Sequence, residues 1–299
     1  MLGVQREPSA NLAIDTGLVG TRGYKFLLQR WANLPDRLTG LRPNPLLNVN
    51  YYVDSSQDTE YISWQSSLRK RLSKNLSGSV HYTWGRALST GGGDIGAYYQ
   101  GDANSDVLQE FSNPRADRGP STGDITHYFA SEWIYEAPRS SRLPNVARHV
   151  LGGWQLSGIL LAQTGEPVTV TQSSVIPTSR PDFAGGTVIN SDYRTTLQYL
   201  NPAAFVAVPV GPISRATTRP GNVGVGSIRL PGYWNVDISI AKNIAVGGRM
   251  NVQLRSDMFN AFNRTSLTGL RTNITDRFFG QLLNTRGARV IQLGARVNW

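Results

Sequence analysis

Polar and apolar residues alternate along this sequence with a period of two, and this alternation limits the folds that the chain can adopt. It is clearest from Ala288 to Trp299, where Ile291, Leu293 and Val297 alternate with mostly polar residues. Successive side chains of a strand point to opposite faces of a sheet, so this stretch predicts a strand with one apolar face. A half-buried strand of a soluble sheet would alternate in the same way. The length and the aromatic end favour instead a membrane-spanning strand, which takes about 9–11 residues and has aromatic residues at the interfaces.

The same alternation recurs along the chain and predicts about nine strands. Their connections alternate in length, which is the observation that separates the two interpretations. Loops longer than about 12–15 residues without structure are uncommon in compact soluble domains. An outer-membrane barrel, in contrast, alternates short periplasmic turns with long external loops. The predicted strands are residues 1–6, 11–20, 62–69, 76–85, 127–137, 154–168, 234–240, 250–263 and 288–299; the long connections are 21–58, 89–124, 171–231 and 264–287, and the connection 138–153 is of intermediate length.

The sequence therefore predicts an all-β, antiparallel transmembrane barrel segment with long extracellular loops, short periplasmic turns and a periplasmic C-terminus. No apolar run reaches the roughly 18–20 residues that a membrane helix needs, so a membrane-spanning protein with this sequence would be a barrel. The formal charge of +10 suggests a polyanionic partner. The densest basic cluster is only 69–71, so nucleic acid is disfavoured relative to phosphate-bearing lipid.

Catalytic and cofactor chemistry find little support in the residues. Cysteine is absent, which excludes a Cys-based metal site. The three histidines, His81, His127 and His149, lack the spacing of a metal site, and no G-x-S-x-G motif is present. The glycine-rich segments 91–94 and 221–226 lack the Lys-Ser/Thr of a phosphate-binding loop and are predicted to be flexible loop tips. We expect no enzyme activity, no cofactor and no metal.

The two faces of the predicted strands carry the candidate functional residues. Polar side chains that point into the barrel could contact a plug or a solute; the favoured alternative is a hydrogen-bonded ladder that fills the wall. Tryptophans near strand ends or on outward faces are expected to anchor the barrel at the membrane interfaces. The candidate lumen-facing residues are His81, Gln253, Arg255, Asp257, Asn263, Gln292 and Arg296, and the candidate interface aromatics are Trp64, Trp84, Trp133, Trp154 and Trp234.

Several motifs together resemble a known family. The run R-S-D-M-F-N-A-F-N-R at 255–264 resembles the R-x-E-x-F-N-x-F-N segment near the end of Oar-like TonB-dependent outer-membrane receptors. These acidobacterial-type proteins carry a carboxypeptidase-regulatory-like domain at the N-terminus. Residues 82–85, 124–129 and 153–158 also match family motifs, so the resemblance runs from about Val4 to Trp299. Asp257 stands where the family has Glu, and Thr126 where it has Arg.

The resemblance implies energised uptake of a large or scarce solute across the outer membrane of a Gram-negative bacterium, driven by TonB acting on a plug. Relatives have a signal peptide, a plug and a barrel of roughly 22 strands, a class whose lumen is plugged. An odd set of about nine strands does not complete a single-chain bacterial barrel. Residues 1–299 are therefore expected to be the C-terminal portion of a barrel, with the signal, regulatory-like domain, plug and remaining strands absent.

The resemblance also implies partners: the plug, TonB, outer-membrane lipid including lipopolysaccharide, and the barrel-assembly machinery. Two other functions stay open. One is a smaller independent pore or adhesin barrel, and the other is a soluble basic β-protein that binds polyanions. The residues that the assembly machinery would read as an insertion signal are Ile291, Leu293, Ala295, Val297 and Trp299.

Overall fold

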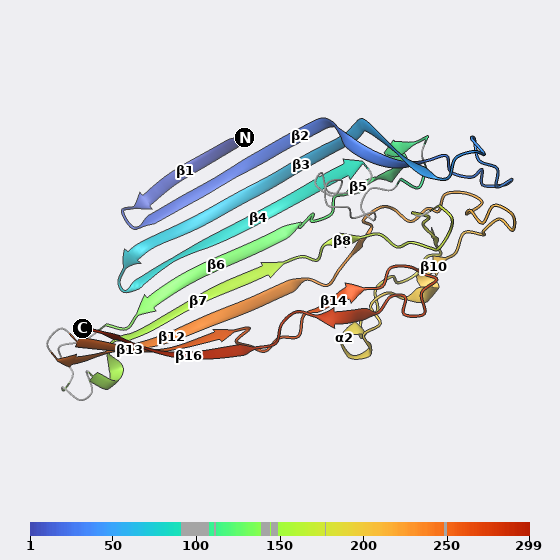
Figure 1. Cartoon of the computed structure of the whole chain (residues 1–299). Helices are drawn as coiled ribbons and strands as arrows, with labels where there is room; N and C mark the ends of the chain where they lie inside the picture. The colour runs from blue at the N-terminus through green and yellow to red at the C-terminus, as the bar shows by residue number, and fades with distance from the viewer. Residues whose placement is uncertain (91–107, 111, 139–143, 145–148, 177, 248–249) are drawn as a thin grey trace.

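A single antiparallel sheet of nine long strands dominates the molecule (Figure 1). The computed structural model describes residues 1–90, 108–110, 112–138, 144, 149–176, 178–247 and 250–299. Each strand pairs with the preceding one of the series, and a short strand, β5 (Arg118–Pro120), adds to β4. The all-β fold with about nine strands is thus confirmed. In sheet order the strands are β1 (Leu2–Ser9), β2 (Leu12–Ala32), β3 (Asn50–Ser73), β4 (Leu76–Thr90), β6 (His127–Glu136), β7 (Trp154–Gln163), β12 (Tyr233–Gly247), β13 (Met250–Phe259) and β16 (Val290–Asn298).

The connections divide the sheet into two different ends. At one, called the turn end, β1 joins β2 through Ala10–Asn11 and β3 joins β4 through Lys74–Asn75. Both Lys74 and Asn75 have positive φ, as a two-residue type I′ hairpin requires. The long connections gather at the other end, called the loop end, and the C-terminus lies at the turn end (Figure 1). The predicted alternation of short and long connections is therefore present, with one intermediate connection at the turn end, 137–153 between β6 and β7.

Strands β2 and β3 are longer than predicted. The expected loop at 21–58 is reduced to 33–49, because β2 and β3 stay paired from Gly20–Ile62 up to Ala32–Asn50. The register shifts between Gly23 and Leu28, and Lys25 has a positive φ. Bulges of this kind insert a residue into one strand and so interrupt the alternation of period two. Strict alternation therefore does not predict this extension of the hairpin.

The register separates the two rows of side chains that the sequence predicted. Directly paired residues share a face of the sheet. The face called the apolar face carries a row of successive partners: Trp133, Gly158, Ile238, Met258 and Ile291. Its side chains stay uncovered: Leu254 is 47% and Leu293 81% exposed. The next row, on the opposite or polar face, runs through Ser157, Ser239, Asp257 and Gln292.

The hydrophobic core lies outside the sheet, in what we call the loop layer: residues 33–49, 108–126, 164–232 and 260–289 as far as they are described. A cluster around Leu200, Phe205 and Phe279 is almost fully buried there. The layer contains short elements: η2 (Pro114–Asp117), β8 (Pro167–Val168), β9 (Asp182–Phe183), α2 (Tyr193–Thr196), η3 (Pro202–Ala204), β10 (Phe205–Val206), β11 (Ile228–Arg229), β14 (Leu267–Leu270) and β15 (Leu282–Thr285).

The prediction of a flexible tip at 221–226 is wrong. Gly221, Val223 and Gly226 are buried in the loop layer. A Cβ on Gly221 would lie 2.0 Å from the carbonyl oxygen of Arg180, so the close approach of two backbones explains the glycine. The other predicted tip, 91–94, lies outside the described residues.

Among the described residues, no helix has the length and apolar character needed to cross a membrane.

Candidate functional site

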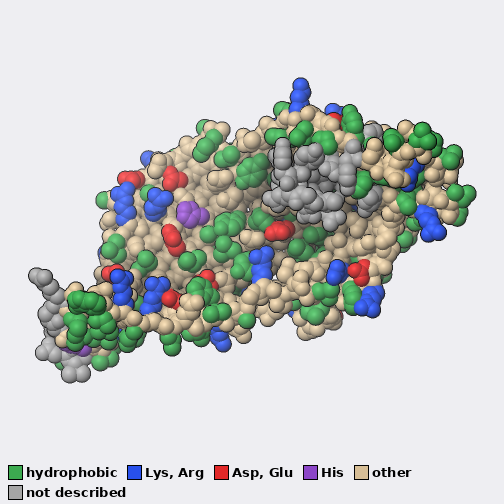
Figure 2. Space-filling model, in the orientation of Figure 1, with side chains coloured by type: hydrophobic (Ala, Val, Ile, Leu, Met, Phe, Trp, Pro, Cys, Tyr) green, Lys and Arg blue, Asp and Glu red, His purple; other side chains and the backbone are tan. Residues whose placement is uncertain are grey.

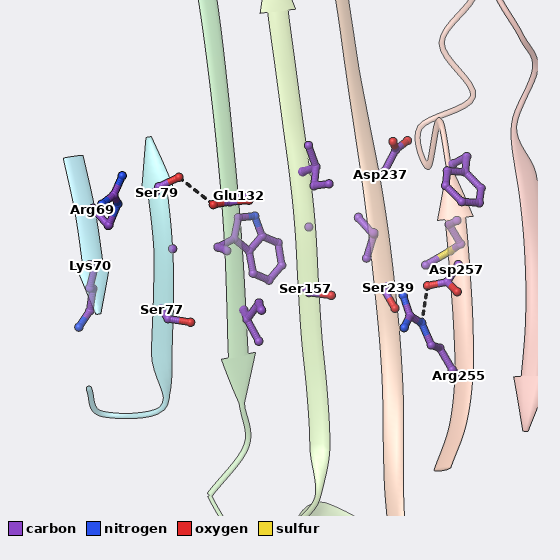
Figure 3. A pocket seen from close by; sticks show the side chains of 18 residues that line it. Arg69, Lys70, Ser77, Ser79, Glu132, Ser157, Asp237, Ser239, Arg255 and Asp257 are labelled. Atoms are coloured by element: carbon purple, nitrogen blue, oxygen red, sulfur yellow. Dashed lines mark hydrogen bonds and ion pairs between the residues drawn. The ribbon is translucent and has the colours of Figure 1, made fainter. Parts of the chain in front are cut away.

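The polar face of the sheet is hollowed and carries charged side chains (Figure 2). One hollow, of about 560 Å³, spans strands β3 to β13. Figure 3 labels the polar residues that line it, contributed by six strands: Arg69, Lys70, Ser77, Ser79, Glu132, Ser157, Asp237, Ser239, Arg255 and Asp257. Lys70 differs from the others, because it pairs with Gly78 and so belongs by register to the apolar face.

Charges of both signs are set at fixed intervals in this hollow. Arg69, Ser79, Glu132, Ile159 and Asp237 are successive partners across five strands, and neighbouring strands are about 4.8 Å apart. The Ser79 hydroxyl donates to Glu132 Oε1 at 3.0 Å. Such an array offers fixed hydrogen-bond donors and acceptors to whatever lies against the wall.

One ion pair and two amide hydrogen bonds hold the carboxylates nearer the C-terminus. Arg255 Nε donates to Asp257 Oδ1 at 2.8 Å (Figure 3). Asn235 Nδ2 donates to Asp237 Oδ1 at 2.7 Å, and the backbone N–H of Asn260 donates to the same oxygen at 2.8 Å. These contacts fix the carboxylates against the wall.

A serine, a histidine and a carboxylate meet on this face, but in an order that does not activate the serine. Ser79 Oγ lies 3.0 Å from His81 Nε2 and donates its proton to Glu132. In a hydrolytic triad the histidine stands between serine and carboxylate and takes the serine proton. Here the serine stands between the other two. In the part of the chain that the structure describes, no group of three His, Asp or Glu side chains is arranged to hold a metal ion.

A second hollow on the polar face, of about 660 Å³, lies over strands β1 to β4. Gln5, Asp15, Gln65, His81 and Thr83 line it. It therefore extends the polar lining toward the β1 edge of the sheet.

Six of the seven candidate lumen-facing residues share the polar face. His81 pairs with Ser67, and the other five lie on facing positions of β13 and β16. Asn263 is an exception, because β13 ends at Phe259 and the chain turns at Asn260 and Asn263, both with positive φ. The five residues on β13 and β16 are Gln253, Arg255, Asp257, Gln292 and Arg296.

All five candidate interface tryptophans share the apolar face by register. Trp64 pairs with Trp84, and Trp133 lies between two glycines, Gly78 and Gly158. Trp154 and Trp234 lie at two different levels along the strands. Trp154 pairs with Lys242, and Lys242 is eight residues from Trp234 along β12. Eight residues span about 27 Å along a strand, or about 21 Å along the membrane normal at the usual tilt.

This spacing suits the apolar band of a barrel, which is about 25 Å tall between two aromatic girdles. Between those two levels, the apolar face of β7, β12 and β13 carries no charged residue in the described chain. Of the proposed insertion residues, Ile291, Leu293, Ala295 and Val297 lie on the apolar face of β16, and Trp299 follows the strand.

The family is decided by the sequence pattern described as "Outer membrane beta barrel domain", which matches residues 1–292. The chain belongs to this family. A domain of this family crosses the outer membrane with its strands, so its apolar face lies against lipid and its polar face against the barrel interior. This places the protein in the outer membrane.

Three solved structures resemble the outer membrane β-barrel domain over 98% of its length. They are the outer membrane transporter YddB from Escherichia coli (10% identity, TM-score 0.49), the ferric-catecholate import receptor Fiu from E. coli K12 (12%, 0.47) and FpvA of P. aeruginosa bound to pyoverdines (10%, 0.42). The domain spans 31%, 26% and 32% of those chains, about a third or less. No curated protein matches the sequence.

Sequence reasoning missed a polar junction that ties the loop layer of the domain together. Its centre is a buried ion pair, with Arg180 Nη2 2.5 Å from Asp117 Oδ1. The side chains of Arg180 and Asp117 are 6% and 1% exposed. The backbone N–H of Gln109 donates to Asp117 Oδ2 at 2.6 Å. We call Arg37, Gln109, Asp117, Arg180 and Gly221 the loop junction.

Gln109 and Arg37 extend the loop junction to distant parts of the chain. Gln109 Oε1 accepts hydrogen bonds from the backbone N–H of Arg180 and of Gly221, at 2.8 and 3.1 Å. Arg37 donates to the carbonyl oxygen of Gln109 and to Thr217 Oγ1, at 2.9 and 2.6 Å. Burial lowers the pKa of Arg37, while Glu110 opposes that shift. No local sequence pattern marks these residues, because every bond of the junction except that between Gln109 and Asp117 joins segments far apart in the chain.

Proposed function

We propose that this chain forms wall and external loops of a TonB-dependent outer-membrane transporter of the Oar-like type, which takes up a large or scarce solute. The observation that carries the proposal is the open polar sheet. Nine spanning strands leave β1 and β16 as edges, without a further strand partner among the described residues. Open edges are not tolerated in lipid, so these strands suit a wider barrel, of the kind whose lumen is plugged.

In this proposal the polar face lines the solute path. The array of Arg69, Glu132, Asp237, Arg255 and Asp257 contacts the plug or the solute when TonB opens the path along the wall. The turn end and the C-terminus face the periplasm, and the loop end faces the exterior. The role requires no covalent chemistry, which agrees with the expectation that the chain is neither an enzyme nor a cofactor-binding protein.

The loop layer and the edge strand supply the remaining roles. The loop junction holds the external loops in one arrangement before a solute arrives, which lowers the entropic cost of binding. On β16 the apolar row from Ile291 to Val297, followed by Trp299, acts as the signal for the barrel-assembly machinery. Lipopolysaccharide surrounds the loop end of the barrel in the outer leaflet.

Growth on single candidate nutrients, with and without the full-length gene, tests the proposal. We expect one scarce nutrient to support growth only when both this gene and TonB are present. Uptake that persists without TonB would contradict the proposal and favour an independent pore. The double variant Arg255→Ala/Asp257→Ala should reduce uptake while the barrel still assembles, because it removes an ion pair of the polar face without adding a net charge.

A further inference from the structure

A third hollow, of about 700 Å³, lies at the loop end on the side of the apolar face. Three apolar residues of its strand-borne wall, Phe129, Ala162 and Trp234, are successive partners across β6, β7 and β12. His127, Gln163 and Tyr233 of the same strands also line the hollow. The wall contributed by the loop layer is basic and contains Arg194, Arg229 and Arg264. Among the described residues that line this hollow, none is acidic.

The three arginines differ in whether an acidic side chain neutralises their charge. Arg229 forms an ion pair with Asp124 and donates through Nη1 to the Asp124 carbonyl oxygen at 2.5 Å. Arg194 and Arg264 form no ion pair with any described residue. Two unneutralised guanidinium groups therefore face one hollow.

Aromatic rings hold these two guanidinium groups in place. The Arg264 guanidinium carbon lies 4.4 Å from the centroid of the Trp234 ring, and that of Arg194 lies 5.5 Å from the Tyr193 ring. Burial, followed by the charge of Arg194, lowers the pKa of Arg264. Nε of Arg264 is buried and has no hydrogen-bond partner within the described chain. The site thus places two like charges in one hollow whose described lining contains no carboxylate.

The level of the site in the membrane indicates the kind of anion. Trp234 belongs to the aromatic row nearer the loop end, and tryptophan rings at a membrane interface lie at the level of the lipid headgroups. Arginine binds phosphate through paired hydrogen bonds of fixed geometry. An apolar wall directly below a basic wall matches an amphiphile with a phosphate head and hydrocarbon tails.

We propose that Arg194 and Arg264 bind a phosphate group of an outer-leaflet lipid of the lipopolysaccharide type, whose acyl chains lie along Phe129, Ala162 and Trp234. The proposal rests on the orientation given above, with the loop end on the exterior. It adds a defined lipid site, separate from the solute path on the opposite face of the sheet.

Binding of lipid A to the full-length protein in detergent, followed by native mass spectrometry, tests the site. Three probes are compared: lipid A with its phosphates, the same lipid A without phosphates, and inorganic phosphate. We expect the phosphorylated lipid to bind at least tenfold more tightly than either of the other probes. The variant Arg194→Gln/Arg264→Gln should lose this preference, since each charge-assisted pair contributes roughly a tenfold change in affinity.

A matched control is Arg277→Gln, because Arg277 also lies over a ring, that of Phe278, but outside the hollow. The control should keep the full affinity. Equal binding of dephosphorylated lipid A, equal binding of inorganic phosphate, or unchanged affinity in the double variant would each overturn the proposal. Nutrient uptake by the double variant is measured in parallel: loss of lipid binding with unchanged uptake separates this site from the proposed transport function.

Discussion

Large apolar side chains are exposed on one face of the sheet but buried in the loop layer. In the sheet, large apolar residues such as Leu254, Ile291 and Leu293 stand exposed on one face, and backbone ladders between strands hold the structure. In the loop layer, Leu200 and Leu282 are 0% and 1% exposed, as in a soluble domain. The two regions are therefore built for different solvents, hydrocarbon and water. A substitution should destabilise one region without the other.

The largest effect is expected from removing the carboxylate of the loop junction. Asp117→Ala leaves Arg180 buried without its counter-charge, which costs about 3–5 kcal/mol in measured cases. We expect the loop layer to open while the sheet keeps its structure. Hydrogen exchange should show faster exchange at 108–124 and 178–182 and unchanged protection in β12 and β13.

The matched control is an exposed ion pair at the turn end. Arg71 Nη2 lies 3.1 Å from Glu7 Oε1, and both side chains are more than half exposed. Glu7→Ala should change stability by about 0–1 kcal/mol, because solvent screens an exposed pair. Loss of protection in the sheet after Asp117→Ala would show that the sheet and the loop layer unfold together. That result would contradict the expectation that one region can be destabilised without the other.

The next largest effect compares the two faces of the sheet through arginine substitutions at two adjacent leucines. Leu160 lies on the apolar face opposite Val236, and Leu161 on the polar face opposite Asn235. Leu160→Arg places a charge against lipid and should cost about 2–4 kcal/mol. Leu161→Arg places the same side chain against the barrel interior and should cost far less. Unfolding in guanidinium after assembly into lipid vesicles measures both, and equal costs would refute the assignment of the faces.

The sheet could be predicted from the sequence because one rule, alternation with a period of two, governs every spanning strand. It placed all nine strands and put Arg255, Asp257 and His81 on the polar face. Alternation did not predict the part of β2 beyond the bulges near Lys25. It also placed Asn263 on a strand, although this residue follows the end of β13.

The loop layer could not be predicted in the same way. Its core joins Val170, Leu200 and Phe279, which are far apart in the chain and follow no period. The loop junction and the pair Arg194 and Arg264 are likewise set by tertiary contacts between segments of irregular structure. Glycines at 221–226 indicated flexibility when taken alone, whereas Gly221 in fact permits two backbones to touch.

A smaller effect is expected at that glycine. Gly221→Ala brings a methyl group within 2.0 Å of the Arg180 carbonyl oxygen and 2.5 Å of that of Pro181, so the loop layer should lose about 1–3 kcal/mol by overpacking. Gly224→Ala is the control, since its Cβ would meet only Ser227, at 3.6 Å. Limited proteolysis of the two variants compares them. Equal cleavage rates would mean that the close approach at Gly221 contributes nothing to the order of the loop layer.

The smallest effect depends on pH and concerns the core of the loop layer alone. Burial, with a lesser contribution from Tyr193, raises the pKa of Tyr199 to about 12, and its hydroxyl donates to the Arg229 carbonyl oxygen at 2.7 Å. A raised tyrosine pKa means that the folded layer retains the proton more strongly than the unfolded chain, where the pKa is about 10. The contribution of this group to stability is thus complete below pH 10 and declines as the pH rises toward about 12. Tyr199→Phe should cost about 1 kcal/mol at neutral pH and remove this alkaline decline. Hydrogen exchange of the loop layer as a function of pH measures both, and an alkaline decline that persists in Tyr199→Phe would assign it to another group.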